Sequence, residues 1–270
     1  MKLEGSKILV TGASSGIGAA LAPILAERGA TVGIVARRAD RLEAVLERAK
    51  KHAPDSRMWA ADLSDLPGAE RLALEAWDAF GGLDAIVHNA AIPKRVHMSR
   101  LTIDDVTETM DINFHSPVRM TLAILPKMLE RKSGTILWVS SMGGRIPIAN
   151  ESAYNAAKYA MCGFAEAMYL DLGGSGVDVK LVMPGPIDTE IWDIPGNEPA
   201  LMDIDKVPAA DCAAGIADAL AGDGFEYYVP PVYPGGIGAK DLAVGKVTDC
   251  DNYLRGFADM ARAMREQAGN

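Results

Sequence analysis

Short runs of β-branched residues alternate with longer segments of helical pattern along most of this chain. The strand-like runs are residues 7–10, 31–35, 57–60, 83–87, 135–139 and 177–182. The helix-length segments between them are residues 17–28, 41–51, 68–80, 103–131 and 152–172. Parallel strands joined through helices by right-handed crossovers place helices on both faces of one sheet. The alternation therefore predicts a single-domain, doubly wound parallel α/β sheet, whose ligands bind beyond the carboxyl ends of the strands.

Composition limits the partners of such a domain. The chain has 270 residues, of which 49% are hydrophobic and 23% charged, as in ordinary globular proteins with a full core. Acidic residues number 36 against 27 basic ones, so the net charge is -9, which disfavours binding to the phosphates of nucleic acid. Residues 8–26 carry no charge, but serines, glycines and a proline divide them, which disfavours a membrane span.

The cysteines and histidines show no metal-binding pattern. They are Cys162, Cys212, Cys250, His52, His88, His97 and His115. Three widely spaced cysteines support neither a disulfide framework nor a zinc cluster, and no two histidines have ligand spacing. We therefore expect buried thiols, no metal, and a reducing compartment such as the cytoplasm.

A glycine-rich turn follows the first strand-like run and leads directly into a helix. The residues expected to contact a ligand there are Gly12, Ser14, Ser15, Gly16, Ile17 and Gly18. Glycines let the backbone approach a pyrophosphate, and the helix N-terminus offers free N–H groups and a positive dipole end. The turn predicts dinucleotide binding; the alternative is a tight strand-to-helix turn of an unrelated α/β protein.

The residues after the second strand-like run bear on the choice of dinucleotide. An acidic residue at this point would bind the ribose hydroxyls of NAD, but Ala36 stands there. Arg37 and Arg38 follow, and a guanidinium matches the geometry of a 2′-phosphate. This favours NADP, with NAD possible; the alternative is that both arginines form a solvated helix start.

A second group of residues consists of candidate catalytic side chains. Tyr154 and Lys158 are four residues apart at the start of a predicted helix, so their side chains share one face. Ser141 follows the run 135–139, where an α/β sheet places its active groups. Each residue alone could be structural: a strand-end serine, a half-buried tyrosine and a solvated lysine.

Together these motifs resemble the short-chain dehydrogenase/reductase family, over about residues 1–229. They are, in order, Thr11-Gly12-x-x-x-Gly16-Ile17-Gly18, Asn89-Ala90, Asn113, Ser141, Tyr154-x-x-x-Lys158 and Pro184-Gly185-x-x-x-Thr189. The resemblance implies a Rossmann-like fold in which Tyr154 donates and accepts the proton and Ser141 holds the substrate oxygen. It further implies that Lys158 binds the nicotinamide ribose and that Asn113 positions a water leading from Lys158 to solvent.

The resemblance also extends the cofactor site. Asp62 should contact the adenine, Asn89 and Ala90 the adenosine side, and Ile187 and Thr189 the nicotinamide amide and the phosphates. Leu63, Pro184 and Gly185 are expected beside the cofactor as well. The family usually has Asn-Asn-Ala-Gly where this chain has His88-Asn89-Ala90-Ala91, which puts the local hydrogen bonding in doubt.

Elementary electrostatics predicts a role for Lys158. Tyrosine has an ordinary pKa near 10, and an ammonium about 4 Å away stabilises the phenolate by roughly 4 kcal/mol at an effective dielectric near 20. We therefore expect the pKa of Tyr154 to fall by up to roughly 3 units, toward neutrality, before desolvation reverses part of the change.

The sequence identifies the substrate less specifically than the cofactor. Residues 186–208 break the strand–helix pattern and are predicted to form a substrate lid. With Met142, Ile148 and Trp192 as substrate-binding residues, the site suits an apolar secondary alcohol or ketone; the alternative for these side chains is core packing. A 3-oxoacyl thioester is a second candidate, although acidic residues of the lid disfavour acidic carriers. A third reading is a dinucleotide sensor without turnover, but such a protein needs no Ser141 or Tyr154.

Residues 232–270 form an extension that 3-oxoacyl reductases of the family usually lack. Its apolar stripe at helical spacing consists of Leu254, Phe257, Ala258, Ala261 and Met264. We expect this stripe to dock on the same subunit or on a partner, with membrane contact as the alternative. By the family resemblance the protein forms a homodimer or homotetramer.

Overall fold

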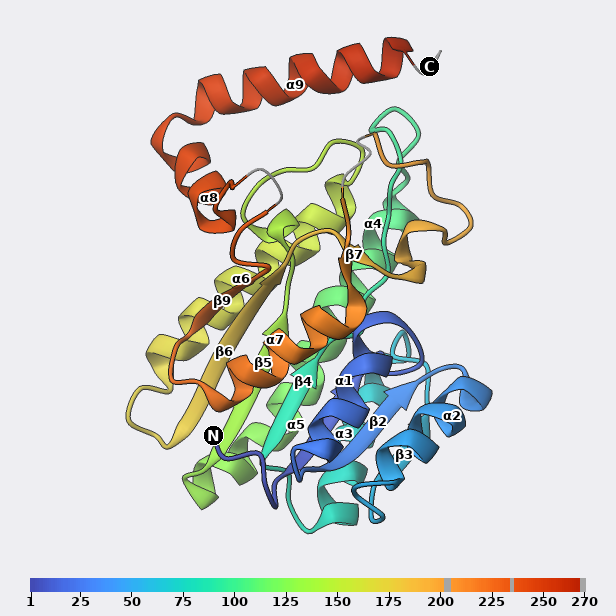
Figure 1. Cartoon of the computed structure of the whole chain (residues 1–270), viewed down its shortest axis with the longest axis vertical. Helices are drawn as coiled ribbons and strands as arrows, with labels where there is room; N and C mark the ends of the chain where they lie inside the picture. The colour runs from blue at the N-terminus through green and yellow to red at the C-terminus, as the bar shows by residue number, and fades with distance from the viewer. Residues whose placement is uncertain (202–204, 234–235, 268–270) are drawn as a thin grey trace.

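A seven-stranded parallel sheet is the centre of the molecule (Figure 1). The computed structural model describes residues 1–201, 205–233 and 236–267. The strands, in sheet order, are β3 (Arg57–Ala60), β2 (Thr31–Ala36), β1 (Lys7–Thr11), β4 (Ala85–His88), β5 (Gly134–Val139), β6 (Val177–Pro184) and β9 (Glu226–Val229). The predicted doubly wound parallel sheet is confirmed.

The strand order reverses direction between β1 and β4. These strands lie side by side, with Ile8 opposite Ala85 and Val10 opposite Val87. From β1 the chain moves outward through β2 and β3, then returns to β4 and continues to the other edge. At such a switch point the loops diverge to opposite faces and leave a crevice at the carboxyl ends.

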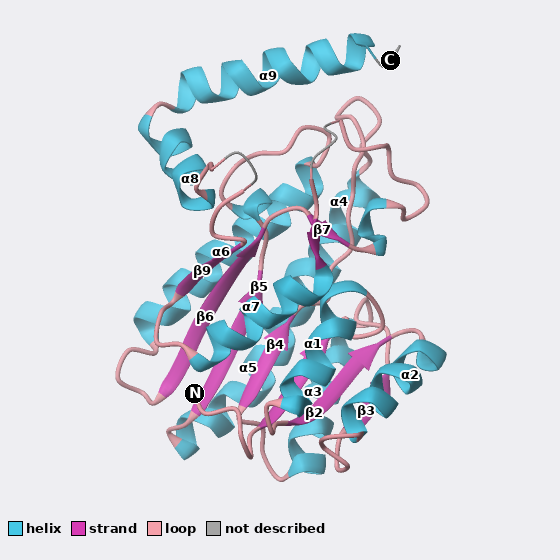
Figure 2. Cartoon of the chain, viewed as in Figure 1, coloured by secondary structure: helices cyan, strands magenta, loops and turns pink. Residues whose placement is uncertain are grey.

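Helices cover both faces of the sheet (Figure 2). One face carries α1 (Gly16–Glu27), α2 (Ala39–Lys50) and α7 (Ala209–Ala221), and the other α3 (Leu66–Phe80), α5 (Ser116–Arg131) and α6 (Ser152–Asp171). Each face has its own apolar core. Ile8, Leu21 and Ile216 belong to the first core, and Leu9, Ile124 and Met161 to the second. Alternation along β1 therefore fills both cores, as both faces of the strand are buried.

The predicted single helix over 103–131 is wrong in its centre. It divides into α4 (Ile103–Met110), a π-helical turn Asp111–His115, and α5. Pro117 explains the interruption, because it has no N–H to donate to the Asn113 carbonyl four residues earlier. The extra residue of a π turn changes the direction of the side chains around it, and such turns are frequent at functional sites.

Other segments lay outside the predicted pattern. The strand expected over 83–87 is β4, two residues shorter at its start, and α7 and β9 were not predicted. In the predicted lid, β7 (Ile187–Asp188) pairs with β8 (Val207–Pro208). The extension contains α8 (Ala239–Thr248) and α9 (Cys250–Gln267), while residues 202–204 of the lid and 234–235 and 268–270 of the extension lie outside the described residues. No helix in the described part of the chain has the length and apolar character needed to cross a bilayer.

Candidate active site

The glycine-rich turn is closed so tightly that side chains would not fit. Gly12 has a φ of +70°, and a Cβ on it would lie 2.7 Å from the Cα of Ala90. A Cβ on Gly18 would lie 2.4 Å from the Gly12 carbonyl oxygen. Gly16 faces the other side of the crevice, where its Cβ would approach Thr189 to 2.9 Å. This cradle of bare backbone at the start of α1 fits the phosphates of a dinucleotide.

Asn89 and Ala90, at the end of β4, hold the turn in place. The backbone N–H groups of both residues donate to the Thr11 hydroxyl at 3.1 Å. The Asn89 side-chain amide donates to the Thr11 carbonyl at 2.9 Å. Two predicted cofactor-binding residues therefore lie against the glycine turn.

His88 departs from the family pattern without entering the site. Its ring is buried against Trp138, with ring centres 4.7 Å apart, and its Nε2 lies 2.7 Å from the Thr121 hydroxyl. Burial lowers the pKa of His88 to about 3, so the ring is neutral at physiological pH.

Two arginines and a serine meet beside the start of α1. The Arg38 guanidinium donates from Nη2 to the Ser14 hydroxyl at 3.2 Å and from Nη1 to Glu190 at 3.0 Å. Arg41, which was not among the predicted residues, also donates to Glu190. Arg37 does not contact Ser14 or Glu190. The pKa of Asp62 is lowered mainly by a hydrogen bond from the Ser64 backbone, and the charge of Arg37 acts in the same direction. Leu63 is buried in the second core, which leaves only its backbone for a ligand.

Ser141, Tyr154 and Lys158 converge at the carboxyl end of β5. Ser141 follows this strand and accepts a hydrogen bond from the Gly143 N–H at 3.1 Å. Tyr154 and Lys158 lie one turn apart at the start of α6, with the Lys158 Nζ 5.6 Å from the Tyr154 ring centre. Lys158 is 1% exposed, and its Nζ donates to the Val139 carbonyl at 3.0 Å.

The predicted lowering of the Tyr154 pKa is wrong in this structure. Burial raises the pKa of Tyr154, the Glu151 carboxyl acts in the same direction, and Ser141 and Arg95 only partly oppose them. Lys158 is itself affected, since burial lowers its pKa to about 8. Desolvation, which the residue spacing does not reveal, is the largest cause of the raised pKa.

Asn113 lies in the π-helical turn and is fully buried. Its side-chain oxygen accepts from the Ile92 N–H at 2.8 Å, and its Nδ2 donates to the Ile92 carbonyl at 2.9 Å. The side chain thus fastens the helix to the loop after β4. It does not line the pocket that contains Lys158.

A buried ion pair beside Tyr154 was not predicted. Arg95 Nη1 lies 3.6 Å from Glu151 Oε1, and the two side chains are 4% and 9% exposed. Arg95 also donates to the carbonyls of Trp192, at 2.6 Å, and Glu198, at 3.0 Å. Burial raises the pKa of Glu151 to about 7, against the opposing charge of Arg95. No local sequence signal joins residues so far apart along the chain.

One cavity of about 980 Å³ joins these features. The predicted site residues that line it are Ile17, Asn89, Ser141, Met142, Ile148, Tyr154, Lys158, Pro184, Gly185, Ile187, Thr189 and Trp192. The remaining predicted residues, which do not line it, are Gly12, Ser14, Ser15, Gly16, Gly18, Arg37, Arg38, Asp62, Leu63, Ala90 and Asn113. Several of these surround the glycine turn, so the cavity covers the predicted substrate residues and only part of the predicted cofactor residues.

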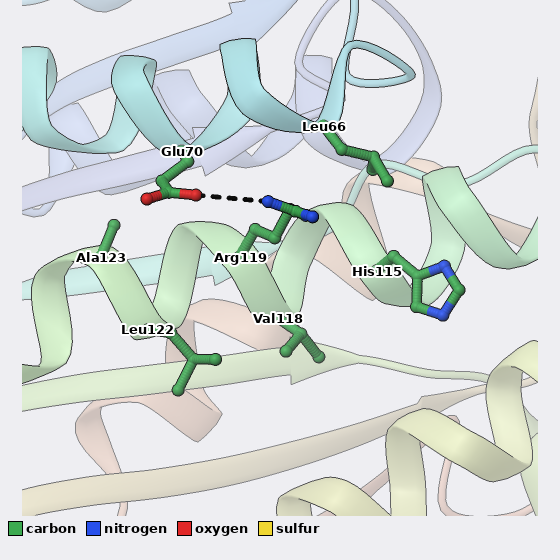
Figure 3. Close-up of a pocket in the computed structure, with 7 residues that line it drawn as sticks. All are labelled: Leu66, Glu70, His115, Val118, Arg119, Leu122 and Ala123. Carbon is green, nitrogen blue, oxygen red and sulfur yellow. Dashed lines mark hydrogen bonds and ion pairs between the residues drawn. The ribbon is translucent and has the colours of Figure 1, made fainter.

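A second cavity, of about 600 Å³, lies between α3 and α5, away from these residues (Figure 3). It contains none of the predicted site residues, and Arg119 crosses it to Glu70 at 3.4 Å. His115 also lines it, with its Nδ1 2.8 Å from Asp111 Oδ1, and Leu122 and Val118 are apolar.

Dinucleotide-dependent oxidoreductases are the class of enzyme that this fold and site define, because a phosphate cradle and a tyrosine–lysine pair open on one crevice. A family model described as short chain dehydrogenase matches residues 6–196. The chain belongs to the short-chain dehydrogenase/reductase family and is an NAD(P)-dependent dehydrogenase or reductase.

Curated relatives agree with this assignment. An Anopheles gambiae dehydrogenase/reductase SDR family protein 7-like is 32% identical over 246 residues, 86% of this chain and 77% of that protein. The 3-oxoacyl acyl-carrier-protein reductase of Vibrio cholerae is 33% identical over 210 residues, 77% of this chain and 84% of that enzyme. Dehydrogenase/reductase SDR family member 7 of Mus musculus is 34% identical over 195 residues, 70% of this chain but only 58% of that protein.

Solved structures share the fold. A short chain dehydrogenase from Burkholderia cenocepacia, in complex with NADP, has a TM-score of 0.76 at 24% identity, over 95% of this chain and 99% of that one. One from Burkholderia phymatum, in complex with NAD, has a TM-score of 0.78 at 22% identity, over 86% of this chain and 91% of that one.

Proposed function

We propose that this protein interconverts an apolar ketone and its secondary alcohol, with NADP preferred over NAD and Tyr154 as the general acid and base. The observation that carries this proposal is the group of half-buried Ser141 and Tyr154 and buried Lys158, which lines a largely apolar cavity together with residues expected beside the nicotinamide.

The bound dinucleotide would supply the hydride that reduces the carbonyl carbon. Tyr154 donates the proton to the carbonyl oxygen, and its raised pKa keeps the phenol protonated until that step. The Ser141 hydroxyl donates a hydrogen bond to the same oxygen and stabilises the charge that develops there. Carbonyl, hydride and proton together give the alcohol, and oxidation reverses each step.

Lys158 acts through its charge. The ammonium near Tyr154 stabilises the phenolate left after proton transfer, and the Val139 carbonyl holds it in place. In the family arrangement Lys158 also binds the nicotinamide ribose, and Asn113 positions a water that leads to solvent. Asn113 is held for such a role by its two hydrogen bonds to Ile92.

Arg38, with Ser14 beside it, supports the preference for NADP. A 2′-phosphate at this point would replace Glu190 as the anion that Arg38 and Arg41 bind. Since fold neighbours contain either NADP or NAD, the preference rests on these side chains.

Residues 186–208 are proposed as the substrate lid, because Ile191, Trp192 and Leu201 line the cavity. A 3-oxoacyl thioester is the second candidate substrate, favoured by the relative from Vibrio cholerae. We also propose a homodimer or homotetramer, checked by sedimentation velocity, in a reducing compartment such as the cytoplasm, consistent with the free buried thiols Cys162 and Cys212.

The test follows absorbance at the nicotinamide band in both directions, with NADPH and NADH, across aliphatic and aromatic ketones, their alcohols, and 3-oxoacyl thioesters. Turnover of apolar ketones with NADPH supports the proposal. Turnover of thioesters alone selects the second candidate. Binding of NADPH without any turnover would favour a dinucleotide sensor.

A further inference from the structure

Helix α9 crosses the molecule beyond the carboxyl edge of the sheet and is fastened near its two ends (Figure 1). Near its start, Tyr253 packs against the second core. Near its end, Arg265 donates to the Asn150 side-chain oxygen at 3.3 Å. Asn150 lies just before α6, and its Nδ2 donates to Glu198 of the predicted lid at 3.2 Å. The middle of α9 thus spans the space between two anchors.

The apolar stripe of α9 faces this space. Leu254, Phe257, Ala258, Ala261 and Met264 all line the cavity that contains Ser141 and Tyr154. The opposite side of the helix is charged and includes the exposed pair Arg262–Asp259, 2.7 Å apart. An amphipathic helix normally buries its apolar face against a core. Here Leu254 remains 41% exposed, because the stripe faces a cavity and not packed side chains.

The cavity is larger than the chemistry requires. At about 980 Å³ it lies at the upper end of roughly 300–1,000 Å³ for ligand pockets, and its lining reaches from Ser141 and Tyr154 to α9. Its other walls include Ile148 and Trp192, which are also apolar. A molecule that contacts the stripe therefore lies in the same cavity as the reacting tyrosine.

We propose that α9 is the roof of the substrate site and selects long apolar substrates, whose tails lie between the α9 stripe and the wall formed by Ile148 and Trp192. The inference rests on the proposed function and names the substrate class. At 1.5 Å per residue, the stripe from Leu254 to Met264 extends about 15 Å, which suits an extended hydrocarbon chain or a polycyclic body.

The kinetic test uses 2-alkanones of four to twelve carbons with NADPH. For the wild type, kcat/KM should rise by about fourfold for each methylene that reaches the roof. In Phe257→Ala and Met264→Ala, kcat/KM for 2-dodecanone should fall by about tenfold, while 2-butanone, too short to reach the stripe, changes by less than about twofold. Val247→Ala is the matched control, because Val247 is 78% exposed on α8 and does not line the cavity.

A binding test separates the roof from catalysis. The fluorescent apolar dye anilinonaphthalene sulfonate is displaced from the NADPH-bound protein by 2-alkanols of rising chain length. Longer alkanols should displace it at lower concentration in the wild type and in Val247→Ala, and this dependence should weaken in Phe257→Ala. If the chain-length dependence weakens in Phe257→Ala but no carbonyl compound is turned over, the result supports α9 as part of the binding site and contradicts the proposed function.

Three results would overturn the proposal that α9 is the roof of the substrate site. The first is an equal loss for 2-butanone and 2-dodecanone in Phe257→Ala. The second is an alkanol displacement series that is the same in wild type and Phe257→Ala. The third is a lower sedimenting mass in Phe257→Ala than in Val247→Ala, which would assign the stripe to contact with a second copy of the chain.

Discussion

Burial sets the protonation of the side chains around the reacting centre more than neighbouring charges do. Lys158 and Glu151 are buried and Tyr154 is half-buried, and for each the largest cause of the pKa shift is desolvation. The sequence motif identified Tyr154 and Lys158, because their spacing on a helix is local. It could not reveal how deeply the tertiary structure buries them, and the predicted direction of the Tyr154 shift was therefore wrong. Glu151 and its partner Arg95 meet only in the folded chain.

The free energy of unfolding should depend on pH through the buried Glu151 carboxyl. Its pKa is raised from 4.5 to about 7, so the folded state binds the proton more tightly than the unfolded state does. The stabilisation is complete below about pH 4.5 and is lost as the pH rises to about 7, up to roughly 3 kcal/mol in the limit. Glu151→Gln does not titrate. Relative to the wild type, its free energy of unfolding should therefore improve between pH 4.5 and 7, measured by denaturant unfolding at both pH values.

A constant difference between wild type and Glu151→Gln across this range would contradict the assignment. Because all other titrating groups are common to both proteins, their contributions cancel in the comparison. Folding of the variant at pH 4.5 serves as the control for structural damage.

Cofactor preference should depend on Arg38. A charge-assisted hydrogen bond contributes about 1.5–3 kcal/mol, so Arg38→Ala should raise the KM for NADPH by roughly 10- to 100-fold and leave that for NADH nearly unchanged. Glu190→Gln, which removes the competing carboxylate, should lower the KM for NADPH. Arg71→Ala is the matched control, because this exposed arginine of α3 pairs with Asp65 and is not among the site residues. An equal rise for both cofactors in Arg38→Ala would show that this arginine does not recognise the phosphate.

At the scale of elements, long-range hydrogen bonds from Arg95 and Asn150 connect the proposed lid to the loop after β4 and to the residues just before α6. The strands and helices with strong local patterns could be predicted, but the helical pattern of residues 103–131 continues across Pro117 and does not reveal the interruption near Asn113. The edge strand β9 was missed as well, since its half-buried Glu226–Val229 shows no clear alternation of buried and exposed positions. Nothing local indicates that Arg95, after β4, contacts the carbonyls of the lid.

Loss of Arg95 should loosen this connection. In Arg95→Met two buried carbonyls and the Glu151 carboxyl lose their partner, so the free energy of unfolding should fall by about 3–5 kcal/mol. The substrate KM should also rise, because Trp192 would no longer be held over the cavity. Arg100→Met is the control, since this exposed arginine also contacts Glu198 and its exposed pair contributes only about 0–1 kcal/mol. A loss no greater than that of Arg100→Met, measured by denaturant unfolding, would contradict the role of Arg95.

At the scale of the whole molecule, the glycine turn, the catalytic residues and the extension meet at one edge of the sheet. The amphipathic pattern of residues 254–264 could be recognised from the sequence. The surface it faces could not, because periodicity defines a face of a helix and not its neighbour. The structure places that face over the cavity, so the proposed site combines the family motifs that end at Thr189 with the last helix of the chain.

The most direct test of the account is the rate of carbonyl reduction by Tyr154→Phe with NADPH bound. Phenylalanine keeps the ring but removes the proton donor, so kcat should fall by about 10²- to 10⁴-fold while NADPH fluorescence shows unchanged cofactor binding. Tyr159→Phe, five residues further along α6 and outside the cavity, should keep the wild-type rate within about twofold. Wild-type kcat in Tyr154→Phe would contradict the assignment of Tyr154 as the general acid and, with it, the central claim.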